Sequence, residues 1–559
     1  MLRVRKVSEQ TAPSLRVPAF ALFALIFTVT WALHGPLLRL PYFWDEAGYY
    51  IPAARDLWLH GQLIPTSTLS SGHPPLVMAW LAFWWEFSAY TPAMTRTAML
   101  MIAAFGLVGV YRLAKLVANV PVAVAATALT AIYPVWFAQS SLAHLDVAAA
   151  AFTFWGLASY LQDHRWRAVV FFALAGISKE TAIVAPLVLF AWERIALGRF
   201  WKPRMGSGDT VWYVSSLAPF ERVSWLRSLS LLVSALPLAA WFIFHRVRTG
   251  VFFGNPEFFR YNVSATADPL RFVLALVQRF WHAFGYENLF VLTIAAGMAM
   301  LYSPLRESLA VSGAAISEER RRISIPVQIV FGLLILAYIF MLAVVGGAVI
   351  ARYMLPVVPL VIIVAVSTLR RRVRWWPWAI VAIVATFVLA LLVNPPYRIA
   401  PEDNLTYADY VRLHKQASDV ISQKYADARV LTAWPASDEL TRPWLGYVSR
   451  PIRVLRIDNF SLPQMQLAAQ EASQFDLVYV FSTKYEPARP MFGSPFWRRL
   501  QERFFDYHQD IPPQLAARML GGRIVYEASR DGEWVALIEI QRAENVRLYS
   551  PGLGALSRK

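Results

Sequence analysis

Residues 40–56 read LPYFWDEAGYYIPAARD and place two adjacent carboxylates, Asp45 and Glu46, directly after the first long apolar run of the chain. Acidic side chains near a bilayer are costly, so their presence there usually marks a function. Three interpretations fit the pair: the start of a solvated loop, a pair of metal ligands, or a general base. The aromatic residues around the pair match an ordinary membrane-interface belt and do not decide between these interpretations.

The overall composition is that of a membrane protein. Of the 559 residues, 57% are hydrophobic and 16% are charged, with a mean hydropathy of +0.43, whereas soluble domains carry about 25% charged residues. A net charge of +17 would suit nucleic-acid binding. The basic residues instead cluster in short loops between apolar runs, as the positive-inside rule describes. Cysteine is absent, which excludes disulfides, thiolate nucleophiles and cysteine-based metal sites.

Apolar runs recur along residues 1–395 and predict an α-helical polytopic membrane protein with about 11 spans plus interfacial helices. They lie near 18–40, 97–117, 119–138, 142–161, 166–178, 180–195, 228–246, 284–303, 325–346, 349–368 and 375–394. The first run follows MLRVRK and lacks a small-residue cleavage site, so we expect a retained helix with a cytoplasmic N-terminus. The segment HPPLVMAWLAFWWEFSAY is expected to be interfacial or re-entrant, because a further span there would invert the basic loops that follow.

The loop charges agree with this topology and place the C-terminal part outside the cytoplasm. Every second loop is basic, namely YRLAKL, QDHRWR, ERIALGRFWKPR, EERRRIS and LRRRVRWW. After Asn394 the composition becomes ordinary. Strand-like runs (ARVLTAW, IRVLRI, FDLVYVF, GRIVYEA, WVALIEI) alternate with a helical QMQLAAQEAS, which predicts a small α/β domain. We therefore predict a transmembrane domain over 1–395 and an extracytoplasmic α/β domain over 396–559.

The costly polar residues of the membrane part all map to outer helix ends or outer loops. They are Asp45, Glu46, His73, Asp146, Lys179, Glu180, Arg260, Arg352 and Tyr353. Random placement would divide them between the two faces, so one extracytoplasmic site where acids and bases face each other is the simplest explanation. Ordinary structural interpretations stay open for single residues: helix capping by the carboxylates, pairing of Lys179 with Glu180, and snorkelling of the arginines.

This ordered set resembles the GT-C superfamily of polyprenyl-phosphate-sugar-dependent glycosyltransferases, especially bacterial protein O-mannosyltransferase-like proteins and the aminoarabinose transferases that modify lipid A. The resemblance covers residues 15–395 and rests on FWDEAGYY, GHPPL, LAHLDVAAAAF, GISKETA and ARYMLPVVP. It implies that Asp45 is the catalytic carboxylate, with Glu46 beside it. It also implies that Asp146 is a second acid close to a substrate sugar.

The same resemblance implies substrate-binding and phosphate-binding positions. His73 stands where the family often has a lysine before Pro-Pro, and a histidine is mostly neutral at pH 7. Lys179 matches the lysine of a TKG pattern in which Glu180 here replaces the glycine. Positions close to the lipid phosphate are matched by Arg260, Arg352 and Tyr353.

The implied activity is inverting sugar transfer from a polyprenyl-phosphate carrier to an acceptor hydroxyl on a protein, lipid A or another glycolipid. It would take place at the outer face of a bacterial inner membrane, with no nucleic-acid partner. No cofactor is indicated with certainty; a divalent metal, which some relatives bind through Glu and His, has no convincing histidine ligand here. A second class of function stays open, a transporter or flippase for a lipid-linked or small polar substrate. Such proteins usually carry internal repeats and midplane charges, and the sequence shows neither.

Overall fold

The computed structural model describes residues 18–199, 225–252, 254, 268–311, 314–345, 348–487, 489–491, 493–505 and 507–541. The chain divides into two compact units. Unit 1 comprises residues up to Ala408 together with Arg489–Phe505, and unit 2 comprises Asp409–Ala488 and the residues from Asp506 onward. The predicted domain boundary at 395/396 stays a prediction. The return of a C-terminal segment to unit 1 was not anticipated.

Unit 1 begins with an apolar helix and a loop that carries the acidic pair. Its first elements are α1 (Ala19–Leu33), the short 3-10 turn η1 (Gly35–Leu37), the π-helical turn η2 (Glu46–Tyr50), α2 (Ile51–His60) and α3 (Leu76–Phe87). Asp45 immediately precedes η2. The predicted interfacial segment therefore forms one helix of 12 residues, α3, which is shorter than the roughly 20 residues that a spanning helix needs.

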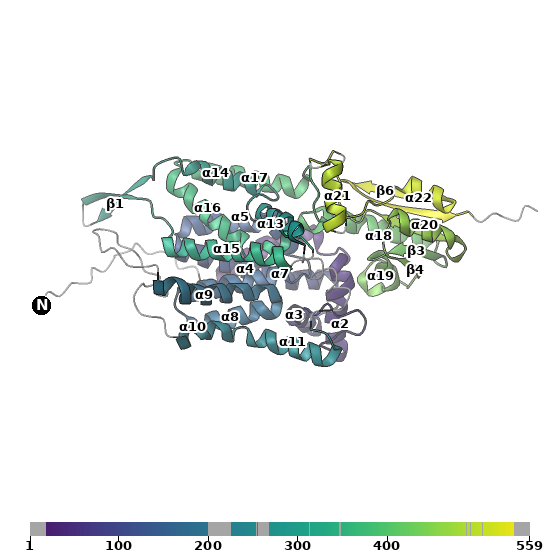
Figure 1. Ribbon diagram of the computed structural model, residues 1–559, viewed down its shortest axis with the longest axis horizontal. Helices are drawn as coiled ribbons and strands as arrows, with labels where there is room; N and C mark the ends of the chain where they lie inside the picture. Colours follow the sequence, from purple (N-terminus) through teal and green to yellow (C-terminus); the bar gives the residue numbers. More distant parts are fainter. Residues whose placement is uncertain are drawn as a thin grey trace, which may run out of the picture. The chain divides into compact units, whose positions relative to one another are not determined.

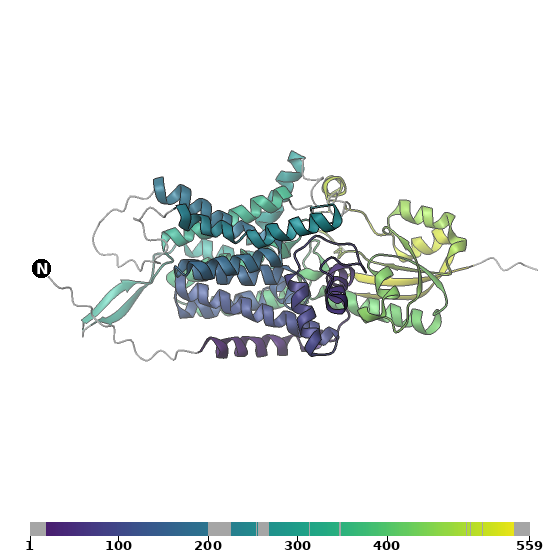
Figure 2. The ribbon, with the colours of Figure 1, turned by 90° about the horizontal axis from the view of Figure 1, so that it is seen from below.

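The centre of unit 1 is a bundle of closely packed helices, which run side by side in Figures 1 and 2. It contains α4 (Pro92–Val117), α5 (Val120–Ile132), α6 (Pro134–Gln139), α7 (Asp146–Leu161), α8 (Arg165–Ser178), η3 (Glu180–Ile183) and α9 (Val184–Arg199). Glycines allow the close approach: a Cβ at Gly156 would lie 2.6 Å from the ring of Phe172, and one at Gly109 would lie 2.9 Å from Trp155. Small residues at helix interfaces are typical of membrane bundles, because packing rather than hydrophobicity drives association there.

The later elements of unit 1 complete the bundle. They are α10 (Trp225–Val233), α11 (Leu236–Thr249), α13 (Pro269–Phe284), α14 (Leu289–Ala299), strands β1 (Arg306–Val311) and β2 (Ala314–Glu319), α15 (Ile325–Val345), η6 (Ala351–Met354), α16 (Val358–Arg372), α17 (Trp376–Leu392), η7 (Pro401–Asp403) and α21 (Pro495–Phe504). β1 and β2 form an antiparallel hairpin in the basic loop between α14 and α15, where no strand was predicted.

Among the described residues, two helices are each long and apolar enough to cross a membrane, α4 and α15. The bent pair α10 and α11 passes the same test when its two helices are taken together, and several shorter helices are apolar. The chain is thus a membrane protein, and the count of 11 spans stays a prediction. Helix α13 was missed because its buried arginines, Arg271 and Arg279, interrupt the apolar run.

Unit 2 is an α/β domain, and all five predicted strand segments are confirmed. The strands are β3 (Arg429–Ala433), β4 (Arg453–Ile457), β5 (Leu477–Phe481), β6 (Gly522–Arg530) and β7 (Glu533–Ile540), in the order β4-β3-β5-β7-β6. The first three are parallel, and β7 joins β5 in antiparallel register. The remaining elements are α18 (Thr406–Lys424), which starts at the end of unit 1, then α19 (Ala436–Thr441), η8 (Pro443–Leu445), α20 (Leu462–Gln470), η9 (Ala472–Gln474) and α22 (Pro513–Leu520). The predicted helix corresponds to α20.

Candidate active site

Asp45 is presented by an unusual piece of backbone. Trp44, the residue before it, has a φ of 40°, a conformation that is a genuine outlier for a bulky side chain. Holding one residue there costs about 1–3 kcal/mol, and such strain clusters at functional sites. The side chain of Asp45 is 23% exposed, and its Oδ2 lies 2.5 Å from Nη2 of Arg352. The acid therefore combines access from outside with one strong cationic partner.

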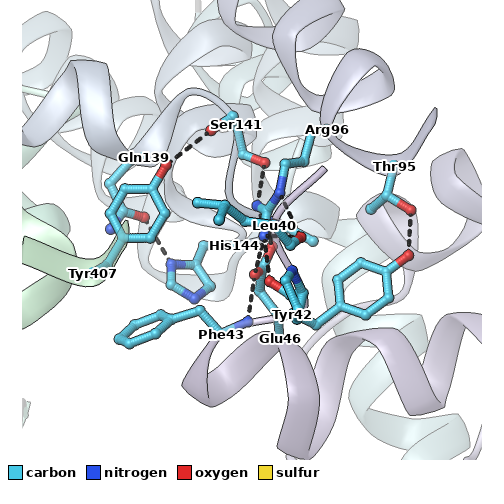
Figure 3. A network of polar contacts seen from close by, with 12 residues as sticks. Leu40, Tyr42, Phe43, Glu46, Thr95, Arg96, Gln139, Ser141, His144 and Tyr407 are labelled. Carbon is cyan, nitrogen blue, oxygen red and sulfur yellow. Dashed lines mark hydrogen bonds and ion pairs between the residues drawn. The ribbon is translucent and has the colours of Figure 1, made fainter. Parts of the chain in front are cut away.

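Glu46 occupies a different environment from its neighbour, shown in Figure 3. Its side chain and that of Arg96 on α4 are both fully buried and form an ion pair at 3.3 Å. Glu46 also accepts hydrogen bonds from the backbone N–H groups of Phe43 (2.8 Å) and Ala143 (2.6 Å). Arg96 donates to the carbonyls of Leu40, Pro41 and Ser141. This pair, hereafter the Glu46–Arg96 clamp, ties the Asp45 loop to the loop before α7.

Arg352, in η6, joins three acidic residues that are far apart in the sequence. Besides Asp45, its Nε lies 3.4 Å from Asp146 Oδ2, and its Nη1 lies 3.4 Å from Glu402 Oε1. Nη1 also lies 2.7 Å from Nδ1 of His144. All of these partners except Asp45 are buried. Arg352 thus donates hydrogen bonds to Asp45 and His144 and forms ion pairs with Asp146 and Glu402.

Lys179 supplies the second cation next to Asp146. Its Nζ lies 2.5 Å from Asp146 Oδ1 and 3.6 Å from the centre of the Tyr353 ring. The guanidinium of Arg279 lies 5.5 Å from the same ring, and it is held by the carbonyls of Ala348 and Ile350. Tyr353 is therefore surrounded by cations, an arrangement that aromatic faces stabilise.

His73 and Glu180 form a pair of their own beside the residues that contact Arg352. Nδ1 of His73 lies 2.9 Å from Glu180 Oε2. The ring of Tyr50 lies between this pair and the partners of Arg352. Its centre lies 6.1 Å from that of the His73 ring and 5.9 Å from that of the His144 ring, and His144 contacts Arg352. Lys179 pairs with Asp146 and Glu180 pairs with His73, so the simple interpretation of Lys179 and Glu180 as partners of each other does not describe this structure.

The structure thus brings together most of the predicted site residues. Asp45, Asp146, Lys179, Arg352 and Tyr353 form one cluster, hereafter the Arg352 cluster, with His73 and Glu180 beside it. Arg260 lies outside the described residues. No group of three or more His, Asp or Glu side chains in the described part of the chain is arranged to hold a metal ion.

The fold can be compared with solved structures. ArnT from Cupriavidus metallidurans in the apo state matches with a TM-score of 0.51 at 14% sequence identity, over 93% of this chain and 97% of that chain. The chain has the fold of ArnT. ArnT bound to undecaprenyl phosphate matches with a TM-score of 0.49, at the same identity and coverage. The oligosaccharyltransferase of Archaeoglobus fulgidus in complex with Zn and sulfate matches with a TM-score of 0.43 at 14% identity, over 83% of this chain and 67% of that chain. No family model and no curated protein sequence matches the chain.

Sequence reasoning within the GT-C resemblance missed two charged residues, one that contacts Arg352 and one that pairs with Glu46. Glu402 follows the last predicted span, in the sequence RIAPEDNL, where an acid looks like an ordinary turn residue. Arg96 sits in the first turns of a helix, where an arginine looks like a snorkelling side chain. The only available signal was position, because both lie at the outer ends of predicted spans, as the other site residues do.

Asp403, next to Glu402, is expected to make the stability of unit 1 depend on pH. Burial and the charge of Glu402 raise the pKa of Asp403 to about 7, although Tyr286 donates a hydrogen bond to it at 2.6 Å. An acid whose pKa is higher in the folded protein stabilises the fold at low pH, and this stability is lost as the pH rises from about 4 through about 7. We expect Asp403→Asn to remove about 4 kcal/mol of this dependence, at 1.36 kcal/mol for each pKa unit.

Thermal unfolding of the purified chain in detergent between pH 4 and pH 8 measures the effect. The melting temperature of Asp403→Asn should vary less with pH than that of the wild type, whereas Asp427→Asn, which changes an exposed carboxylate, should follow the wild type. Burial also raises the pKa of Glu533 in unit 2 to about 7, so the informative quantity is the difference between the two variants. Parallel curves for all three proteins would contradict the prediction.

Proposed function

We propose that this protein transfers a sugar from a polyprenyl-phosphate carrier to an acceptor hydroxyl, with inversion at the anomeric carbon. The observation that carries the proposal is the Arg352 cluster itself: a partly exposed carboxylate, Asp45, lies beside the buried Arg352, and the buried Lys179 pairs with Asp146 in the same cluster. A base next to concentrated positive charge is the arrangement that transfer from a phosphate leaving group requires.

Asp45 is the general base in this mechanism. The acceptor oxygen gives its proton to the Asp45 carboxylate and forms a bond to the anomeric carbon. The bond from that carbon to the phosphate oxygen breaks, and its electron pair leaves with the carrier as a phosphate monoester. Because Arg352 binds Asp45 in the structure described here, part of this interaction must pass to the substrate before the carboxylate can accept a proton.

The leaving phosphate needs positive charge more than it needs an acid. Lys179 and Arg352 supply that charge, with His73, Arg260 and Tyr353 as further phosphate-side or sugar-side groups. Fixed cations in a site with little water stabilise developing negative charge far better than they would in solution. Asp146, held by both Lys179 and Arg352, orients a sugar or acceptor hydroxyl, and Glu46 acts through the position of its neighbour.

The carrier, the acceptor and the location are parts of the same proposal. ArnT, whose fold the chain shares, binds undecaprenyl phosphate in one of its crystal structures, which supports a polyprenyl-phosphate carrier. The acceptor hydroxyl belongs to a protein, lipid A or another glycolipid. The loop charges support a bacterial inner membrane, with the N-terminus in the cytoplasm and both the site and the C-terminal domain outside it.

An assay in detergent micelles tests this function against the transporter alternative. Micelles do not separate two aqueous compartments, so a transporter cannot move its substrate from one side to another in them. The purified chain is incubated with a panel of polyprenyl-phosphate sugars and hydroxyl acceptors, and released polyprenyl phosphate is measured. We expect release that depends on the acceptor. Movement of the lipid-linked sugar across proteoliposomes without any release in micelles would identify a transporter and overturn the proposal.

A further inference from the structure

Helix α21 is a C-terminal segment that belongs to unit 1. It follows a connection from β5 of unit 2, yet Arg489–Phe505 belongs to unit 1 by its packing. The backbone N–H of Met491 donates to the carbonyl of Pro396 at 2.8 Å, and Arg398 donates to Gln501. At the other end, Nε of Arg271 donates to the carbonyl of Phe504 at 3.2 Å. Specific contacts therefore hold the segment at both of its ends.

These contacts fix the level of α21 along the bundle. Pro396 follows the end of α17, whose last apolar residues, Leu392 and Val393, are exposed. Arg271 lies in the first turn of α13, next to the exposed Leu270. The segment is thus attached next to the ends of two helices that expose apolar side chains, and Figure 1 shows α21 running across the direction of the bundle helices.

The sequence of α21, PFWRRLQERF, is strongly two-sided. At 100° per residue, Phe496, Trp497, Leu500 and Phe504 fall on one side, and Arg498, Arg499, Glu502 and Arg503 fall on the other. Phe504 is buried, but Phe496 is 64% exposed, as is Met491 just before the helix. The three arginines are exposed and outnumber the single acid. Exposed aromatic and basic residues on one short helix are the composition of helices that lie in a membrane interface.

We propose that α21 docks on the outer surface of the bilayer, with Phe496 and Met491 among the lipid chains and its arginines against anionic phospholipid headgroups. The proposed binding partner of α21 is thus anionic lipid and not a second protein. The charge of the helix, its attachment level and its exposed apolar residues each favour that occupant. Each arginine close to an anionic membrane surface should favour the docked state by roughly fivefold.

The absence of cysteine from the chain gives a direct test in the full-length protein. Phe496→Cys carries a spin label, and Leu515→Cys on α22 in unit 2, also an exposed apolar residue, is the matched control. Both proteins are placed in nanodiscs of phosphatidylglycerol or of phosphatidylcholine, and collisions of the label with oxygen and with a water-soluble nickel reagent are measured. In phosphatidylglycerol we expect the label at 496 to collide more often with oxygen than with the nickel reagent. We expect the label at 515 to collide more often with the nickel reagent.

Charge reversal separates lipid docking from simple burial. Adding Arg498→Glu and Arg499→Glu to the 496 label should shift it towards nickel in phosphatidylglycerol, with little change in phosphatidylcholine. A label at 496 as accessible to nickel as the label at 515 would overturn the proposal. A label shielded from both reagents in both lipids would overturn it too, because it would indicate contact with protein. A shift of equal size in both lipids would show that anionic headgroups are not the partner.

Discussion

Replacing Asp45 by asparagine should lower kcat for sugar transfer about 10²–10⁴-fold, the usual contribution of a general base. Asparagine keeps the shape of the side chain, and its carbonyl can still accept the hydrogen bond from Arg352 Nη2, but it cannot take a proton. Arg352 retains Asp146 and Glu402 as acidic partners, so the cluster should stay assembled. Single-turnover release of polyprenyl phosphate in micelles measures the rate, and the melting temperature reports on the fold.

The matched control is Glu86→Gln, which neutralises an exposed acid on α3 of the same unit. It should transfer sugar at the wild-type rate. A wild-type rate in Asp45→Asn as well, with normal folding, would remove Asp45 from the mechanism but would leave the enzymatic function standing, because the micelle assay would still show release. The two failures are therefore distinguishable.

Replacing Arg96 by methionine should destabilise unit 1 by about 3–5 kcal/mol, the usual effect of leaving one member of a buried ion pair alone. Glu46 would remain fully buried, with only the N–H groups of Phe43 and Ala143 as partners. The loops on both sides of the Glu46–Arg96 clamp would lose their common support as well. Thermal unfolding in detergent should show a lower melting temperature. Arg112→Met, which removes an exposed arginine from the same helix, should leave that temperature nearly unchanged.

The double variant Glu46→Gln with Arg96→Met separates a positioning role from a catalytic one. It removes both buried charges, so much of the lost stability should return. If Glu46 only positions Asp45, the double variant should transfer sugar faster than Arg96→Met alone. Full recovery of stability with no recovery of transfer would instead place Glu46 among the groups that contact the substrate. Equal stability of the two variants would show that the unpaired charge is not what destabilises Arg96→Met.

The site residues that could be predicted from the sequence are charged side chains in apolar surroundings, where a charge has a high cost in free energy. Asp45 and Asp146 interrupt apolar surroundings, and so their convergence could be expected before any coordinates were known. Glu402 could not be recognised in the same way, because an acid after a Pro in a polar stretch carries no visible cost. The different environments of Asp45 and Glu46, one partly exposed and one fully buried, could not be predicted either, because neighbouring positions in a sequence do not reveal which side chain is buried.

The secondary structure shows a similar division. The five strands of unit 2 were visible as short β-branched and aromatic runs. Helix α13 was hidden because the signal for a span is average apolarity, and Arg271 and Arg279 lower the average even though both are buried and bonded. Helix α21 was hidden for another reason: its apolar side is short, and nothing local indicates that it belongs with residues about a hundred positions earlier.

The allocation of Arg489–Phe505 to unit 1 means that the polypeptide passes between the two units three times, near residues 408, 488 and 505. A protein built in this way is not a simple tandem of modules. Genetic exchange of unit 2 between relatives by a single crossover near residue 408 would carry a foreign α21 into unit 1. Domain swaps between relatives therefore have to preserve the pairing of the segment Arg489–Phe505 with Pro396 and Arg271, or replace all three together.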